Sequence, residues 1–231
     1  MNPYNPYAQQ RSPVQEGAES NAFLRKVYAY MAGGLFATAV TATVVASSEP
    51  LAQFARSNLL LLVIAEFGMV IAFSALLNRL STAAAAALFF AYAVVNGLTF
   101  SVIFLLYTAS SIGSTFFVTA GTFGAVSVYG YATKRDLSGL GSFAFMGLIG
   151  LIIASVVNIF LHSPMIYWLT TFVGVIVFTG LAAYDTQKLK RFAGSISPDQ
   201  QSKVALQGAL MLYLDFINLF LYLLRLLGRR R

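Results

Sequence analysis

Seven long apolar stretches, separated by short polar segments, dominate the sequence and restrict the folds open to it. A transmembrane helix needs about 20 mainly apolar residues, and each stretch reaches roughly that length. The chain is 58% hydrophobic and only 10% charged, far from the balance of a soluble globular domain. The sequence therefore predicts an all-α membrane protein, a bundle of seven transmembrane helices. We expect these helices at residues 27–47, 59–77, 83–107, 112–131, 143–161, 165–184 and 204–227.

The segment before the first apolar stretch has a different composition. Residues 1–24 are rich in Pro, Gln, Asn and Ser and contain no run that resembles a signal sequence. We expect them to form a disordered cytoplasmic tail, and residues 25–231 to form the seven-helix transmembrane domain. The chain has no cysteine, which excludes disulfides, thiol nucleophiles and cysteine metal sites.

Basic residues indicate the orientation, because Lys and Arg are concentrated in cytoplasmic loops. Only Arg56 lies in the loops of the other side, whereas one side has ten basic residues: Arg11, Arg25, Lys26, Arg79, Lys134, Arg135, Lys188, Lys190, Arg191 and Lys203. This predicts a cytoplasmic amino terminus. The net charge of +7 lies at helix ends, where it would meet anionic lipid head groups, so nucleic acid is not an expected partner.

The seventh stretch leaves two topologies open. A full crossing would place Arg225 and the three arginines after it on the side opposite to the other basic residues, against the charge bias. A re-entrant segment would return them to the cytoplasm. The stretch has 24 residues, which at about 1.5 Å each reach about 36 Å, and this length favours a crossing.

Few ionisable residues lie within the apolar stretches: Glu66 in the second, and Asp215 and the near-terminal Arg225 in the seventh. Intramembrane carboxylates are costly and usually functional. Asp215, Asn218, Tyr222 and Arg225 are spaced i, i+3, i+7 and i+10, which confines them to a stripe about 80° wide on a helix. The stripe should face protein or a cavity, and the alternative is that it only holds a buried helix to its neighbours.

Two further patterns have ordinary structural explanations. Asp185 follows the sixth stretch, where Lys188 could simply pair with it at the surface. Gly121 with Ala125 has the small-xxx-small spacing that indicates close helix packing.

The segments YDTQKLK (184–190) and LYLDFINLFLYLLRLLG (212–228) resemble the Bax inhibitor-1 family, also called the transmembrane BAX inhibitor motif family, in its bacterial branch. The resemblance covers all seven stretches. It implies six helices in two layers of three around a central seventh. It also implies a passive, pH-sensitive calcium leak in the inner membrane, governed by two aspartates that fall here on Asp185 and Asp215.

The chemistry of such a pair follows from electrostatics. Two partly desolvated carboxylates in hydrogen-bonding reach cannot both ionise cheaply, so they share a proton and titrate in two coupled steps. The protonated pair can hold the sixth and seventh helices together through a strong O–H to carboxylate bond. Losing the proton replaces this bond by repulsion and leaves the hard oxygen ligands that Ca²⁺ prefers, so Asp185 and Asp215 are also candidate transient Ca²⁺ ligands.

Depth is a difficulty for this pair. Straight, centred helices would leave Asp185 and Asp215 about 10 to 15 Å apart in depth, and the sixth helix would have to continue through Arg191 to carry Asp185 deeper. The resemblance also implies an acidic and a basic side chain in the second helix near the aspartates. Glu66 fits a mid-membrane layer with Asp215, whereas Arg79 lies past the helix end and fits only a cytoplasmic latch to Asp185.

Other functions are less well supported. Intramembrane aspartyl proteases also use two aspartates, but their Gly-x-Gly-Asp and Pro-Ala-Leu elements are absent here, so we do not expect an enzyme. No nucleotide, phosphate-loop or zinc motif indicates a cofactor, and His162 has no second histidine with which to bind a metal.

Two hypotheses remain. The first is a calcium-permeable leak channel gated by Asp185 and Asp215. The second is a membrane-embedded binding protein that modulates a membrane-anchored AAA protease, a role known for some bacterial members of the family that the chain resembles. It would depend on residues 1–24.

Overall fold

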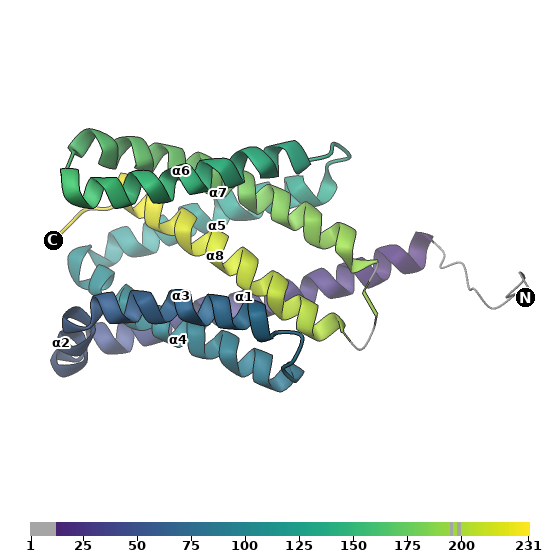
Figure 1. The fold of residues 1–231 in the computed structure, drawn as a ribbon, viewed down its shortest axis with the longest axis horizontal. Coiled ribbons are helices and arrows are strands. Elements are labelled where there is room, and N and C mark those ends of the chain that lie inside the picture. Colours follow the sequence, from purple (N-terminus) through teal and green to yellow (C-terminus); the bar gives the residue numbers. More distant parts are fainter. Residues whose placement is uncertain (1–12, 195, 198–199) are drawn as a thin grey trace, which may run out of the picture.

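The helices are arranged as two layers with one helix between them (Figure 1). The computed structural model describes residues 13–194, 196–197 and 200–231. Within these residues the fold is all-α and has no strand longer than an isolated bridge. Its eight helices are α1 (Pro13–Ala46), α2 (Glu49–Ser57), α3 (Leu59–Leu76), α4 (Thr82–Leu106), α5 (Ala109–Ala132), α6 (Ser138–Leu161), α7 (Pro164–Ala193) and α8 (Gln201–Leu227). All except α2 are long and apolar enough to cross a membrane.

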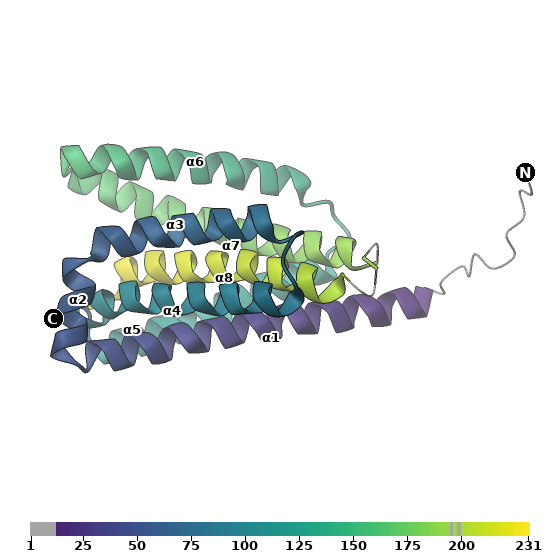
Figure 2. The ribbon, with the colours of Figure 1, turned by 60° about the horizontal axis from the view of Figure 1, so that its bottom comes forward.

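The two layers are α1, α3 and α4 on one side and α5, α6 and α7 on the other (Figures 1 and 2). Helix α8 runs between them and packs against α1, α4, α5 and α7. This confirms the predicted seven-helix bundle with two layers around a central carboxy-terminal helix. We call the end where α1 begins the amino-terminal end of the bundle, and the end where α8 finishes the carboxy-terminal end.

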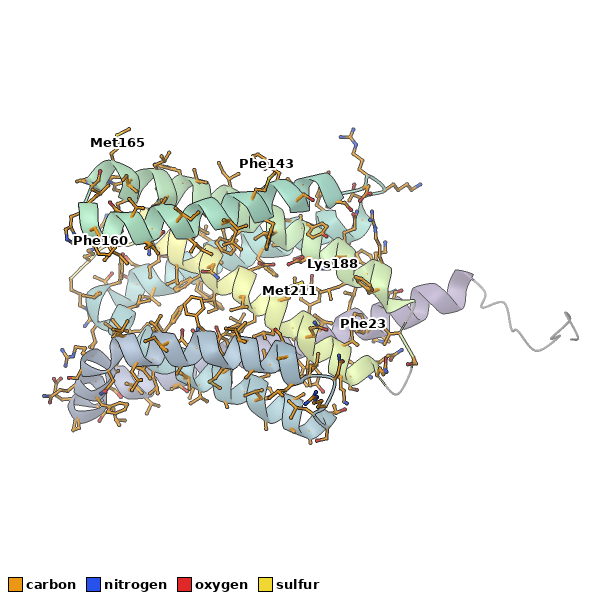
Figure 3. All side chains as sticks on the ribbon, viewed as in Figure 1. Phe23, Phe143, Phe160, Met165, Lys188 and Met211 are labelled. Atoms are coloured by element: carbon orange, nitrogen blue, oxygen red, sulfur yellow. The ribbon has the colours of Figure 1, made fainter. Side chains whose placement is uncertain are left out.

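Burial follows this layered order. In the apolar window of α8, 56% of residues are buried inside the protein, but in α3 and α6 only 11% are. Phe143 and Phe160 of α6 and Met165 of α7 are exposed, and Phe143 and Met165 point away from the bundle in Figure 3. Apolar side chains facing outward over such a surface are expected of helices whose solvent is lipid, and the chain is a membrane protein.

Helix α1 begins at Pro13, well before the domain boundary expected between residues 24 and 25. Phe23 is fully buried and Leu24 nearly so, since both belong to the apolar core. Residues 13–24 are therefore helical in the structure. The polar composition of the segment concealed the two residues that attach it to the core. The remainder of the expected tail, residues 1–12, lies outside the described residues.

The short helix α2 was not predicted, because its nine residues fall far below the length of a membrane span. Its single buried side is made of Ala52 and Ala55, while Phe54 is exposed. Arg56 Nη2 pairs with Glu49 Oε1 at 2.6 Å across two turns. Arg56, the one basic residue that the sequence places in the loops of the side opposite to the other ten, is therefore paired with an acid within α2.

The end of the chain shows how the last helix runs through the bundle. After α8, the backbone N–H of Arg231 donates to the carbonyl of Leu106 at 3.0 Å, and that of Thr108 donates to the carbonyl of Arg229 at 3.1 Å. The carboxy-terminal residues thus lie against the turn between α4 and α5, opposite the end where α1 begins (Figure 1). Helix α8 traverses the whole bundle, as its length favoured.

Close helix contacts occur at other glycines than the one expected. A Cβ atom at Gly121 would meet nothing within 4 Å, so the spacing of Gly121 and Ala125 does not mark a helix interface. At Gly97 a Cβ would lie 2.6 Å from Thr41 Cβ, which shows how closely α4 approaches α1. Beside this contact the hydroxyl of Tyr213 lies 2.7 Å from Thr38 Oγ1, in the buried region where α8 meets α1.

Candidate functional site

The structure brings Asp185 of α7 and Asp215 of α8 together inside the bundle. Both side chains are buried, with 8% and 5% of the residue exposed. Their carboxyl groups lie within hydrogen-bonding reach of each other. Two acid groups in direct contact at such a depth are the central feature of the site.

The length of α7 explains part of this meeting. The helix continues to Ala193, so Asp185 lies eight residues from its end rather than beyond it, which corresponds to about 12 Å at the rise of an α-helix. Helix α8 runs obliquely between the layers (Figure 1), and this tilt reduces the depth gained per residue before Asp215. Continuation of the helix and tilt together remove the mismatch expected for straight, centred helices.

The immediate surroundings of the pair are mostly apolar towards the amino-terminal end. A Cβ atom at Gly208 would lie 2.6 Å from Leu189 Cδ2 and 3.3 Å from Val27 Cγ2. Helices α7, α8 and α1 are therefore in close contact between the pair and that end. Next to Asp185 in sequence, Thr186 is buried and its hydroxyl lies 3.1 Å from the hydroxyl of Tyr28 in α1.

The polar atoms of the pair are incompletely satisfied. Within the described residues, Asp215 Oδ2 is buried and has no hydrogen-bond partner. The nearest basic influence on Asp185 is the positive charge of Lys188, one turn later in α7. A buried carboxylate oxygen without a partner is costly, so binding a proton or a cation at this oxygen would lower its energy.

Glu66 belongs to a different polar group. It lies half-buried on α3, and its Oε1 accepts a hydrogen bond of 2.5 Å from the Thr99 hydroxyl of α4. On the same face of α4, Asn96 Nδ2 donates to the Tyr92 hydroxyl at 3.3 Å. Glu66 thus contacts α4 rather than Asp215. Tyr92, Asn96 and Thr99 are spaced i, i+4 and i+7, which places them on one face of the helix. This spacing could have indicated the polar group from the sequence.

The other polar residues of α8 do not join the pair. Asn218 Nδ2 donates to the carbonyl of Leu214 in its own helix at 2.8 Å. Tyr222 stacks on Phe178 of α7 with 5.8 Å between ring centroids. The Arg225 guanidinium lies 5.2 Å from the Tyr222 ring, a cation–π distance. The predicted stripe therefore divides into one acid that meets α7 and three residues with packing contacts.

Arg79 does not form the expected latch. It lies exposed just past α3. In the part of the chain that the structure describes, its side chain makes no ion pair with Asp185. Arg79 follows α3, which packs chiefly against α4 and not against α7 or α8, and spacing along the sequence does not reveal this.

Seven membrane-spanning helices around a buried acid pair define the class to which the chain belongs, a polytopic membrane protein with an ionisable centre. The family described as "Inhibitor of apoptosis-promoting Bax1" matches residues 20–231. The chain belongs to this family, the Bax inhibitor-1 family.

Several bacterial proteins are similar to the chain over most of its length. The inner membrane protein YbhL of Escherichia coli K12 is 49% identical over 226 residues, which cover 95% of this chain and 97% of that protein. An uncharacterized protein of Borreliella burgdorferi is 45% identical, with 94% of this chain and 96% of the relative covered. A third, from Rickettsia prowazekii, is 44% identical, with 90% of each chain covered.

Proposed function

We propose that the protein is a pH-sensitive, calcium-permeable leak channel of the bacterial inner membrane, with its amino terminus in the cytoplasm. The observation that carries the proposal is the contact between Asp185 and Asp215 at the interface of α7 and α8. The inner-membrane location is supported by the relative YbhL, and the orientation by the basic residues near the amino-terminal end.

The contact can act as a gate because the interaction between the two carboxyl groups is attractive when they share a proton and repulsive when the proton is lost. When the pair holds a proton, an O–H to carboxylate hydrogen bond joins α7 to α8. When the proton leaves, two negative charges face each other in a region where burial weakens screening, and they repel. Deprotonation therefore favours separation of the two helices at this point.

The same oxygens are suitable for a passing calcium ion. Ca²⁺ takes six to eight oxygen ligands, and two carboxylates supply at most four. Within the described residues, no group of three or more His, Cys, Asp or Glu side chains is placed to hold a metal. Water would have to complete the coordination, which suits transient contact with a permeant ion better than a resident metal site.

The test is the pH dependence of Ca²⁺ influx into proteoliposomes that contain the purified protein. We expect Asp185→Asn and Asp215→Asn each to flatten this dependence, because an amide cannot release the proton that links α7 to α8. The proton both closes the contact and removes the charge that attracts the ion, so the informative quantity is the slope of flux against pH.

A matched control is Asp136→Asn, the same change at an acid outside the pair. It should leave the slope of flux against pH as it is in the unmodified protein. If both variants of the pair respond to pH as the unmodified protein does, the proposed gate is wrong.

A further inference from the structure

A surface hollow of about 390 Å³ lies at the amino-terminal end of the bundle, where α6 begins and α7 ends. Its lining is Ser138, Tyr184, Gln187, Lys188, Arg191 and Phe192. Gln187 forms a fixed wall, since its Oε1 accepts from the backbone N–H of Leu137 at 2.9 Å and its Nε2 donates to the carbonyl of Arg135 at 2.8 Å. The hollow is thus built on a braced junction between two helices.

The charge around this hollow is strongly positive. Five basic residues and two acids lie in the loop before α6 and the last three turns of α7: Lys134, Arg135, Lys188, Lys190, Arg191, Asp136 and Asp185. Both acids are already engaged, because Asp136 Oδ1 pairs with Arg191 Nη2 at 2.9 Å and Asp185 is buried against Asp215. The excess charge attracts an anion to this end of the bundle.

Several donors at the hollow remain available. Within the described residues, the Lys188 ammonium donates no hydrogen bond and lies 5.8 Å from the centroid of the Tyr184 ring. Arg191 has five N–H donors and uses one nitrogen on Asp136. The backbone N–H and hydroxyl of Ser138, at the start of α6, both donate to Asp136 Oδ1, so the available donors of the hollow are those of Lys188 and Arg191.

Apolar side chains adjoin these donors. Phe192, in the wall of the hollow, is 52% exposed, and Leu140 and Phe143 lie exposed on α6 as it enters the membrane. Lys188 lies on the last part of α7, towards the amino-terminal end of the bundle (Figure 3). A basic hollow above an exposed apolar helix face matches a ligand with an anionic head and hydrocarbon chains.

We propose that this hollow binds the phosphate group of an anionic phospholipid, with Lys188 and Arg191 as its cationic contacts. The phosphate would accept from both side chains, and the acyl chains would lie along the exposed face of α6. A free phosphate ion shares the charged contacts but not the apolar ones. The site does not depend on ion conduction and can be tested apart from it.

The experiment is native mass spectrometry of the purified full chain in detergent, titrated with phosphatidylglycerol or phosphatidylcholine. We expect phosphatidylglycerol to be retained and phosphatidylcholine not to be. The double variant Lys188→Gln with Arg191→Gln should weaken retention by about twenty-five-fold, at about a factor of five for each basic side chain replaced. Asp136→Asn should strengthen retention, because it releases Arg191 and removes the competing negative charge.

The matched control is Lys26→Gln with Arg79→Gln, which removes the same charge from exposed positions at the same end but outside the hollow. This control should retain phosphatidylglycerol as the unmodified protein does. Equal weakening in both double variants would mean a diffuse charge effect and would overturn the site. Displacement of the lipid by inorganic phosphate at similar concentration would overturn the assignment to a lipid.

Discussion

At the scale of single residues, Asp136 shows what an acid outside the membrane region does in this protein. Its Oδ1 accepts from the Ser138 hydroxyl at 2.7 Å and from the Ser138 backbone N–H at 3.0 Å, and it pairs with Arg191. These interactions stabilise the charged form and lower the pKa of Asp136 to about 2. The carboxylate is therefore already ionised throughout the range in which a channel would respond to physiological pH.

This depressed pKa predicts that Asp136 contributes nothing to pH sensing. The stabilisation that the Asp136 charge provides is complete above the pKa that this aspartate has in the unfolded chain, near 4. It disappears only as pH falls through about 2. Between pH 5 and 8, Asp136→Asn should leave the slope of flux against pH unchanged, as measured in proteoliposomes. A loss of slope as large as that expected for Asp215→Asn would instead locate the pH response in the loop before α6.

The site residues could be predicted in part from the sequence. Asp215 stands out because an acid in the middle of an apolar stretch is costly in a membrane. Such a residue can be identified as a functional candidate from the sequence, before the fold is known. Asp185 had a surface explanation as well, through Lys188, and only the resemblance singled it out. The contacts of Glu66 and Arg79 depend on which helices are neighbours, and no local pattern encodes this.

At the scale of helices, the sequence predicted the positions of the membrane spans better than the residues at which the helices begin and end. Hydropathy located all seven spans, because the cost of leaving backbone groups unpaired in lipid requires long apolar helices. It missed α2 and the buried start of α1, since both are held by contacts to the rest of the protein rather than by lipid. It also ended α7 at residue 184, although the helix continues through basic residues to Ala193.

Close packing between α5 and α7 gives a prediction at this scale. A Cβ atom at Gly130 would collide with the backbone carbonyl of Ala183, which cannot move away as a side chain can. Gly130→Ala should lower the free energy of unfolding by about 1 to 3 kcal/mol through overpacking, measured by thermal unfolding in detergent. Gly124→Ala in the same helix meets open space, so it should be neutral or slightly stabilising. Equal stability of the two variants would contradict this packing.

At the scale of the whole molecule, α8 is the element that joins the two layers. It packs against α1 and α4 on one side and α5 and α7 on the other, whereas direct packing between layers occurs chiefly where α1 meets α7. Helix α7 is braced to the loop before α6 through Gln187. The layer of α5, α6 and α7 is thus suited to move as one body, and under the proposed gate its contact to α8 is where opening would take place.

With the proposed gate, this arrangement predicts that joining α7 to α8 will block Ca²⁺ influx. The chain has no cysteine, so Gly208→Cys with Leu189→Cys introduces a single thiol pair, at a point where the two helices are in close contact. The pair lies between the two aspartates and the amino-terminal end. We expect the oxidised double variant to lose Ca²⁺ influx and the reduced one to recover it, with free thiols counted to establish that the disulfide has formed.

The control joins helices within one layer. A Cβ atom at Gly147 would lie 2.7 Å from Val177 Cγ2, so Gly147→Cys with Val177→Cys joins α6 to α7 without touching α8. Because these helices belong to the same body, oxidation should leave influx unchanged. If the link between α6 and α7 blocks influx as strongly as the link between α7 and α8, opening requires motion inside the layer, and separation at the acid pair is not the gating step.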